Sequence, residues 1–484
     1  MINSLRDFLD ECEKIGELSR VKVQVDWDLE LNHVADISDQ KGGPALIFEN
    51  VKGCKHSCLI AALSKPNRCA IALEMPVGMS RVEMAREWAV RVNRQGIPPK
   101  VLSSGPVQDN VIEEKDVDLS TLPVPKLYPM DGGRYLGTTA ALITREPGAD
   151  WDNLGTYRMQ ILGRNSLGLN LQPGKHARLM LERYRKLGRK MPAAVCVGQL
   201  PVLFLLASTG VPWGVSEYDA AGGIRGEAVE VIQGELTGLQ IPASAEYVLE
   251  GEIDPDPSAY RPEGPFGEYP GYYSASIAED YPKPCFNVKR MFHRDDPIFW
   301  TQSVGAIGAG KNTIPSIQIS ASIWAGLDNL RIPGIKAVYC PPEAGGRFMV
   351  VVAIEQKYYG HAVQVGHAVV ATTTGNYRTK ICIVVDDDIH PDNMDEVLWA
   401  LATRSDAARS VQVFKRTFGE ELDPGVPIEQ RDMNSKLFID ATIPFEWTRK
   451  PIQVQMDPAM IEKVKKQWEK YDINLARKGG ENEI

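Results

Sequence analysis

The sequence predicts a mixed α/β (α+β) protein built from several domains, and three observations support this prediction. The chain has 484 residues, whereas a single hydrophobic core stops growing at ~250–300 residues. Helix and strand patterns alternate near both ends of the chain, which is typical of α/β units. Between them, residues 135–300 carry many strand-like runs and only one clear helix, which indicates a barrel or sandwich.

The first domain is expected over residues 1–115. Ser4 is a good N-cap for a helix over 4–17, in which apolar residues recur every three or four positions. A second helix is predicted over 80–93. Short apolar runs predict strands over 45–51, 58–62 and 69–74.

The second domain is expected over residues 116–313 and is rich in strands. One helix is predicted over 175–188, directly after a Pro-Gly turn. The predicted strands cover 137–145, 156–164, 193–199, 202–208, 245–253 and 285–293.

The third domain, expected over residues 314–455, returns to the α/β pattern. Its predicted helices cover 316–327 and 392–404, and its predicted buried strands cover 348–355 and 380–388. Residues 456–484 are expected to form a C-terminal helix and tail. The amphipathic helix predicted there over 457–472 has room to dock on a neighbouring subunit.

Composition and charge exclude several classes of function. The net charge of −9 and the isoelectric point near 5.5 argue against a nucleic-acid partner, which requires a basic face. No apolar run approaches the ~20 residues of a membrane span, and residues 1–20 lack the apolar segment of a secretory signal. We therefore expect a cytoplasmic protein without nucleic-acid or membrane partners. The eight cysteines are scattered and are expected to be reduced thiols.

Candidate chemistry begins with Arg158. In the strand predicted over 156–164, Arg158 and Gln160 share one face, and an apolar face lies opposite. Arg158 therefore faces either solvent or the inside of a barrel. Lys175 and His176 follow in the first turn of a helix, where free backbone N–H groups attract anions such as phosphate.

A metal site is a second possibility that the residues suggest. Asn153, His176 and Glu217 offer an amide oxygen, an imidazole nitrogen and a carboxylate, a mixture that suits Mn²⁺ or Mg²⁺. Spacing alone does not establish this site, because the three residues are far apart in the sequence. Lys357, at the end of a predicted strand, is a candidate second phosphate contact.

Two carboxylates stand in the stretch "RPEGPFGEYPGYY", residues 261–273. Its prolines and glycines exclude regular structure, so it is expected to form a shaped loop. An exposed glutamate has a pKa of about 4.3 and does not hold a proton at neutral pH. Burial of Glu268 among aromatic rings would raise its pKa, and so would a neighbouring carboxylate such as Glu263.

Four motifs together resemble the UbiD family of prenylated-FMN-dependent decarboxylases. They are "NLGTYRMQ" (153–160), "SEYDAAGGIRGE" (216–227), "EGPFGEY" (263–269) and "YYGHA" (358–362). The resemblance spans nearly the whole chain. It implies an N-terminal α/β domain, a central split β-barrel like that of flavin reductases, and a C-terminal α/β domain that builds a homodimer or homohexamer.

The resemblance also implies a cofactor site. Asn153, His176 and Glu217 would bind Mn²⁺ together with the flavin phosphate, with K⁺ close by. Lys175 stands where many relatives have Gln, so its role departs from the family pattern. The residues implied to bind prenylated FMN are Asn153, Leu154, Gly155, Thr156, Tyr157, Arg158, Lys175, His176, Glu217 and Lys357.

The implied reaction is the reversible non-oxidative decarboxylation of an aromatic, heteroaromatic or other α,β-unsaturated carboxylic acid. Arg158, Glu263 and Glu268 would be the catalytic residues, with Glu268 as the proton donor. A flavin prenyltransferase would supply the cofactor. Trp300 and Gln302 are candidates for the lining of the substrate pocket.

Several alternatives remain open at this point. A flavin-dependent oxidoreductase on a split barrel shares the fold and the phosphate site, but it needs no pair of glutamates around an arginine. The substrate is alternatively an acrylic, cinnamate-type acid. A non-catalytic accessory subunit is a third alternative, and the sequence does not decide between decarboxylation and carboxylation in the cell.

Overall fold

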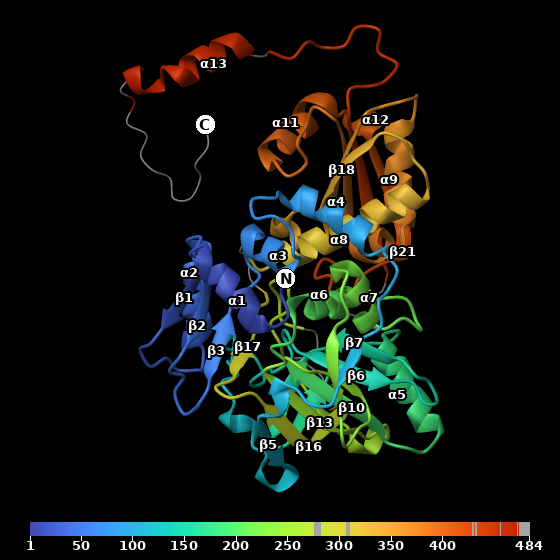
Figure 1. Cartoon of the computed structure of the whole chain (residues 1–484). Coiled ribbons are helices and arrows are strands. Elements are labelled where there is room, and N and C mark those ends of the chain that lie inside the picture. Colours follow the sequence, from blue (N-terminus) through green and yellow to red (C-terminus); the bar gives the residue numbers. More distant parts are fainter. Residues whose placement is uncertain are drawn as a thin grey trace.

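The computed structural model describes residues 1–274, 282–305, 310–427, 430, 433–454, 456–471 and 473. Figure 1 shows three bodies: a small N-terminal α/β layer, a curled sheet at the bottom, and a C-terminal α/β sheet at the top. The mixed α/β fold class predicted from the sequence is confirmed. None of the described helices is long and apolar enough to cross a membrane.

The N-terminal body is a four-stranded sheet in the order β1-β2-β3-β17. Its first helix begins as predicted, because the Ser4 side chain accepts a hydrogen bond from the backbone N–H of Asp7. The last strand, β17, comes from far along the chain and ties this sheet to the residues that follow the barrel. The elements are α1 (Leu5–Lys14), β1 (Leu18–Val21), α2 (Glu30–Gln40), β2 (Ala45–Phe48), β3 (Ser57–Ile60), α3 (Pro66–Ala72), α4 (Arg81–Arg91) and β17 (Ile298–Trp300).

Two predicted strands are wrong. Residues 69–74 lie mostly in helix α3, and residues 202–208 lie in helix α6 (Pro201–Thr209). Both segments are buried almost all round, so their apolar runs carry no period that separates a buried strand from a buried helix. Pro66 and Pro201 stand at the first helical positions, where proline is favoured, and this signal pointed to helices.

The central body is an eight-stranded sheet in which β7-β6-β10-β13-β16-β9-β8 are successive neighbours and β5 pairs with β16. The two edges, β7 and β8, are consecutive in the chain and are joined only by Tyr157 and Arg158. The sheet therefore curls until its edges nearly meet, and Arg158 lies at the split between them. The strands are β5 (Asn110–Glu113), β6 (Ala141–Arg145), β7 (Asp152–Thr156), β8 (Met159–Gly163), β9 (Ser166–Leu169), β10 (Met191–Val197), β13 (Tyr247–Ile253) and β16 (Cys285–His293).

Two further helices and two small sheets complete this body. Helices α5 (His176–Lys186) and α7 (Glu217–Arg225) each begin with a side chain of the predicted metal site. Strand β4 pairs with β11, which links the N-terminal connector to the barrel region. The small strands are β4 (Lys100–Leu102), β11 (Glu230–Gln233), β12 (Gln240–Pro242), β14 (Arg261–Pro262) and β15 (Pro282–Lys283).

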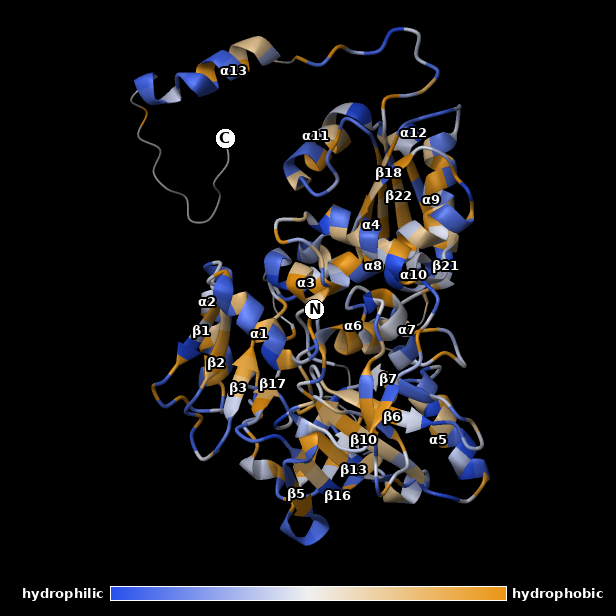
Figure 2. Ribbon diagram, in the orientation of Figure 1, coloured by the Kyte–Doolittle hydropathy of each residue, from blue (hydrophilic) through white to orange (hydrophobic). Residues whose placement is uncertain are grey.

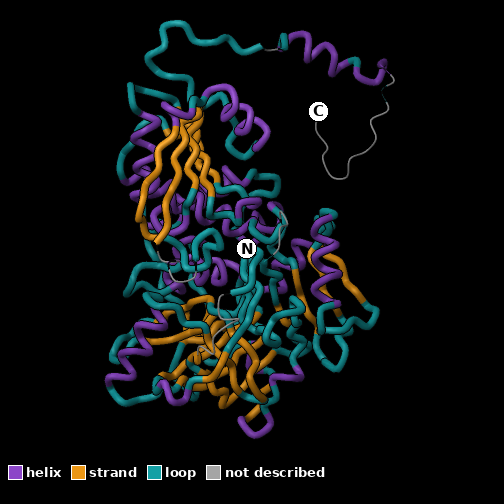
Figure 3. The backbone as a smooth tube through the Cα atoms, turned by 180° about the vertical axis from the view of Figure 1, so that it is seen from behind, coloured by secondary structure: helices purple, strands orange, loops and turns teal. Residues whose placement is uncertain are grey.

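The C-terminal body is a five-stranded sheet in the order β18-β19-β20-β22-β21, with parallel pairing among β19, β20 and β22. Its central strands are strongly apolar and lie between helices, as Figures 2 and 3 show. Helix α4 of the N-terminal segment packs on α8 and β18 of this body. The elements are α8 (Thr313–Asn329), β18 (Ile335–Tyr339), β19 (Met349–Ile354), α9 (His361–Ala371), α10 (Thr373–Arg378), β20 (Ile381–Asp386), α11 (Met394–Arg404), α12 (Ala407–Ser410), β21 (Val411–Phe418) and β22 (Met433–Ala441).

The C-terminal segment leaves the body as an extended arm that ends in helix α13 (Pro458–Lys466), as Figure 1 shows. This helix is shorter than the predicted 457–472, because a 3₁₀ turn over Trp468–Tyr471 follows it. None of the described residues of α13 is buried. Residues 474–484 of the predicted tail lie outside the described residues.

Candidate active site

Arg158 binds both glutamates of the loop 261–273. Its Nε and Nη2 donate to the two carboxylate oxygens of Glu263 at 2.7 and 2.6 Å, which makes a bidentate pair. Its Nη1 donates to Oε1 of Glu268 at 2.5 Å. The side chains of Arg158, Glu263 and Glu268 are 7%, 0% and 15% exposed. One guanidinium thus holds two carboxylates in a site almost closed to water.

Backbone contacts fix the loop that carries the glutamates. The N–H of Gly267 donates to Oδ1 of Asp131 at 2.8 Å, and the N–H of Gly264 donates to Oε1 of Gln160 at 2.9 Å. Gly264 has φ +107°, a conformation that side-chain-bearing residues rarely adopt. The strand predicted over 156–164 is interrupted, because Arg158 lies in the link between β7 and β8 while Gln160 lies in β8. These hydrogen bonds hold the loop backbone, and with it Glu263 and Glu268, in place.

The environment of Glu268 favours its protonated form. Burial raises the pKa of Glu268 above its ordinary value, and the nearby Glu263 carboxylate adds to the rise. Arg158 and Arg347 act in the opposite direction but do not cancel the effect of burial. Phe266 lies under the guanidinium, with the carbon of that group 5.4 Å from the ring centroid.

Asn153, His176 and Glu217 come together at the start of two helices. Asn153 lies in β7, and its Oδ1 is 2.8 Å from Nδ1 of His176. Glu217 accepts the backbone N–H of Leu154, the residue after Asn153, through Oε2 at 2.7 Å. The sequence predicted these three residues from chemistry and the family resemblance, and the structure brings them together.

Two buried atoms of this trio lack a partner among the described residues. They are Oε1 of Glu217 and Nδ2 of Asn153. Burial raises the pKa of Glu217 to about 8, because the carboxylate has lost water and gained only backbone N–H groups. A divalent cation would supply the missing positive charge, so the residues fit a site with oxygen and nitrogen ligands. The described residues hold no group of three His, Cys, Asp or Glu side chains placed to bind a metal ion, so a metal here would need Asn153 as a ligand.

A cavity of about 1230 Å³ lies between the barrel and the C-terminal body. Of the residues predicted to bind a cofactor, Thr156 and Lys175 line it. Leu154 and Tyr157 are 1% and 9% exposed and pack in two different hydrophobic clusters, and neither lines the cavity. A Cβ at Gly155 would lie 2.5 Å from the ring of Tyr157, so only glycine fits beside it.

The C-terminal body adds cations that the sequence reading missed. Arg347 and Arg378 line the cavity with Lys175. Burial and then the charge of Arg378 lower the pKa of Lys175 to about 8, while Glu420 opposes them. Arg378 pairs with buried Glu420. These residues lie in segments that no motif marked; the basic Arg378 just before a buried strand was the only signal available.

The remaining predicted residues lie elsewhere. Lys357 is exposed, pairs with Glu355, and does not line the cavity, so the structure does not bring it to Lys175 and His176. Trp300 is fully buried in the core. Gln302 lines the cavity.

Comparison with known protein families decides the relationship of the chain. Three domain models of 3-octaprenyl-4-hydroxybenzoate carboxy-lyase match: the N-terminal domain at residues 9–92, the Rift-related domain at 100–307 and the C-terminal domain at 313–441. The chain belongs to the UbiD family. Members of this family are carboxy-lyases, so the protein is a decarboxylase.

Solved structures agree with this assignment. The UbiD-class enzyme HmfF from Pelotomaculum thermopropionicum in complex with FMN is 29% identical, with 95% of this chain and 98% of that chain covered and a TM-score of 0.86. The open form of the vanillic acid decarboxylase of Sedimentibacter hydroxybenzoicus is 29% identical, with 97% and 100% covered and a TM-score of 0.85. The 3,4-dihydroxybenzoic acid decarboxylase AroY of Klebsiella pneumoniae is 25% identical, with 96% and 99% covered and a TM-score of 0.81.

Proposed function

We propose that this UbiD protein catalyses the reversible non-oxidative decarboxylation of an aromatic or heteroaromatic acid, or of another α,β-unsaturated acid, with prenylated FMN. The observation that carries the proposal is the single Arg158 guanidinium between Glu263 and Glu268, almost closed to water. An evolved dimeric form of HmfF has been solved in complex with prenylated FMN. Two of the relatives act on phenolic acids, as their names state.

The protein must return a proton to the carbon that loses CO₂. Prenylated FMN, when bound, supplies the sink for the electron pair left by the departing CO₂. Glu268 then donates its carboxyl proton to that carbon and regains one from solvent. Burial raises the pKa of Glu268, which favours the protonated carboxyl that a proton donor needs. Arg158 is held bidentately by Glu263, so it positions Glu268 through the remaining Nη1.

The cofactor would be held at the start of helix α5. Asn153, His176 and Glu217 would bind Mn²⁺, with K⁺ close by, and the flavin phosphate would complete the metal coordination. The orphaned Oε1 of Glu217 supports this, because it is a buried acceptor with no donor among the described residues. Lys175 and the N-terminus of α5 favour a phosphate at this position. The exposed position of Lys357 gives no support to a contact there.

A flavin prenyltransferase would supply the cofactor, and the protein would act as a homodimer or homohexamer. The arm before α13 supports self-association, since Ile452 and Val454 are 95% and 97% exposed on it. Apolar side chains this exposed are stabilised when a second surface covers them.

A flavin-dependent oxidoreductase is the main alternative. It would use the same cavity but would have no need for a second buried carboxylate on Arg158. A reduced nicotinamide cofactor or another reductant would reduce its flavin and remove the visible absorbance, and air would restore that absorbance. A decarboxylase would instead release CO₂ from an acid without any net redox change.

The test is to co-express the chain with a flavin prenyltransferase and to measure CO₂ release from a panel of acids. The panel holds benzoates, hydroxybenzoates, furoates and cinnamates, and the same protein loaded with FMN alone is the control. We expect CO₂ release from at least one ring acid, and only by protein loaded with prenylated FMN. In D₂O the product should carry deuterium on the carbon that lost CO₂. Release of CO₂ from no acid, together with reversible flavin reduction, would favour the oxidoreductase. Labelled bicarbonate incorporated into the product would reveal the carboxylation direction.

A further inference from the structure

Lys311 is a buried cation on the cavity wall that the proposed chemistry leaves unused. It precedes helix α8, its side chain is 6% exposed, and it lines the cavity. Its Nζ lies 2.8 Å from Oδ2 of Asp36 and donates to Oη of Tyr128 at 3.1 Å. Asp36, on helix α2, is itself held by the hydroxyl of Ser303 at 3.0 Å. Three separate segments thus fix one ammonium group.

This group lies beside the loop that carries the proposed proton donor. The Tyr128 ring packs on Gly267, the residue before Glu268, since a Cβ at Gly267 would lie 2.7 Å from that ring. A Cβ at Gly305 would lie 2.9 Å from the carbonyl oxygen of Glu268 and 3.5 Å from the Tyr128 ring. Lys311 is therefore held by a tyrosine that is packed against the Glu268 loop.

The ammonium group keeps its charge and has a donor to spare. Burial lowers the pKa of Lys311, but Tyr128 and Asp36 outweigh it, and the pKa ends above its ordinary value. An ammonium group has three N–H donors, and two of them bond to Asp36 and Tyr128 among the described residues. None of the groups that act on Lys311 is shared with Lys175, which interacts with Arg347, Arg378 and Glu420.

An acceptor for a hydroxyl proton lies on the same cavity. Gln302 lines it, and its buried Oε1 has no partner among the described residues. The neighbouring Ser303 bonds to the same Asp36 that holds Lys311. A cationic donor and a free amide acceptor together match a hydroxyl group, which accepts one hydrogen bond and donates another.

We propose that Lys311 is a specificity-determining residue that, with Gln302, binds a hydroxyl substituent on the ring of the substrate acid. This inference rests on the proposed function. A ring that carries the hydroxyl satisfies both groups, whereas an unsubstituted ring displaces water and leaves a buried donor unpaired. A site built around hydrogen bonds discriminates against an analogue that lacks the partner group.

The first test compares the loaded wild-type enzyme with Lys311→Met on matched pairs of acids, such as 3- or 4-hydroxybenzoate against benzoate. We expect K311M to lower kcat/KM for the preferred hydroxylated acid by about 10–100-fold, mostly through KM, because a hydrogen bond from a charged donor is lost. The unsubstituted acid should change by less than about threefold. Lys289→Met, an exposed lysine paired with Glu114, is the matched control.

The second test measures ligand ionisation without turnover. Protein loaded with plain FMN is titrated with 4-hydroxy-3-nitrobenzoate, whose absorbance reports the ionised phenol. Beside Lys311 the bound phenol should ionise about one pH unit lower than the free phenol, and K311M should abolish the difference. Asp36→Asn preserves the side-chain volume and should also reduce the preference for the hydroxylated acid over the unsubstituted acid. This variant replaces K311M in both tests if K311M does not fold.

The outcomes separate the two proposals. If the wild type decarboxylates no acid but still shifts the nitrophenol titration in a Lys311-dependent way, the proposed function fails and the hydroxyl site stands. If the wild type is active and K311M lowers all acids equally, or changes only flavin retention, Lys311 is not a specificity residue and the inference is overturned.

Discussion

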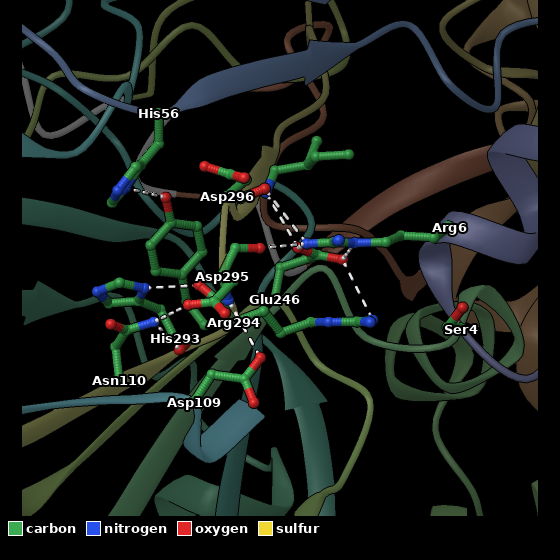
Figure 4. Close-up of polar contacts among 12 residues, drawn as sticks. Ser4, Arg6, His56, Asp109, Asn110, Glu246, His293, Arg294, Asp295 and Asp296 are labelled. Atoms are coloured by element: carbon green, nitrogen blue, oxygen red, sulfur yellow. Dashed lines mark hydrogen bonds and ion pairs between the residues drawn. The ribbon is translucent and has the colours of Figure 1, made fainter. Parts of the chain in front are cut away.

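Two of the arginine–glutamate clusters among the described residues differ in their charge balance. In the first, shown in Figure 4, Glu246 is fully buried and accepts both Nε and Nη2 of Arg6 at 2.9 Å. It also accepts the N–H of Ile298 at 3.0 Å, and Arg294 lies 3.6 Å away. In the second, one guanidinium, Arg158, serves two carboxylates.

This difference in charge balance distinguishes a cluster that stabilises the fold from one that can take part in proton transfer. Around Glu246, two cations and a backbone N–H surround one carboxylate, so helix α1, the start of β13 and the segment before β17 are joined through it. Around Arg158, acids outnumber the cation, and Glu268 has a raised pKa. An excess of donors fixes a carboxylate in place, whereas an excess of acids leaves one able to hold a proton.

The largest effect on turnover is expected when the second carboxylate on Arg158, Glu268, is replaced. Glu268→Gln keeps the size and the contact to Arg158 but has no acidic proton to give. We expect kcat to fall by about 10²–10⁴-fold, the usual contribution of a positioned acid. The measurement is CO₂ release by protein with its flavin content verified by absorbance.

Glu252→Gln, on the outer face of β13, is the matched control and should retain full activity. Wild-type turnover by E268Q would remove Glu268 from the role of proton donor. Loss of flavin together with activity would instead show that Glu268 acts through cofactor retention.

Another buried carboxylate, Glu217, extends the comparison. Burial raises its pKa to about 8, and the described groups that oppose this rise are backbone N–H groups rather than cationic side chains. If Mn²⁺ supplies that charge, dialysis against a chelator should release flavin and activity together. The loss of flavin affinity should be at least the ~10–100-fold that removal of an outer partner of a metal site costs. Added Mn²⁺ should restore both. Full flavin retention after complete metal removal would contradict this site.

Breaking the structural cluster should affect stability rather than chemistry. Of its partners among the described residues, Arg6→Met leaves the buried Glu246 carboxylate with Arg294 and one backbone N–H. Because the Arg6 side chain is 35% exposed, we expect a cost of about 2 kcal/mol, below that of a fully buried pair. Thermal unfolding measures this cost.

The double variant R6M/E246Q should recover part of the lost stability, since it removes the stranded charge. The kcat of folded R6M should match the wild type. A change in kcat with unchanged stability would mean that this cluster couples to the active site.

The two clusters also differ in how far the sequence predicted them. Glu263 and Glu268 were predictable, because a loop of prolines and glycines with two acids and several rings has few structural uses. The alternation around Arg158 and the family resemblance then supplied the partner. Glu246 and Arg6 carried no local signal, because their pairing joins residues 240 positions apart in the sequence.

The same limit explains the other misses. Arg347 and Lys311 reach the cavity only because the C-terminal body packs on the barrel. The strand predicted over 202–208 is helix α6 in the structure, because the apolar pattern of a fully buried segment is the same in a strand and in a helix. The local sequence pattern therefore predicted Arg158 and the loop with Glu263 and Glu268. The charged residues around them, such as Arg347 and Lys311, are placed by tertiary packing, which the sequence pattern does not reveal.

The smallest expected effect is a shift in pH profile when a distant cation is removed. Arg347 lies over Tyr269, 3.7 Å from guanidinium carbon to ring centroid, and its charge lowers the pKa of Glu268. Glu268 must be protonated to act, so turnover falls as the pH rises through its pKa. Removing a positive charge disfavours the ionised form, and Arg347→Met should therefore move this fall to higher pH.

The shift should stay below about one pH unit, because Arg347 acts less strongly on Glu268 than Arg158 does. Arg347→Lys keeps the charge and should move the profile less, which separates charge from packing on Tyr269. Arg294→Met alters the donor-rich cluster around Glu246 and should leave the profile of kcat against pH unchanged. A shift to lower pH in R347M, or equal shifts in R347M and R347K, would show that the acid excess at Arg158 does not set the working pH of the enzyme.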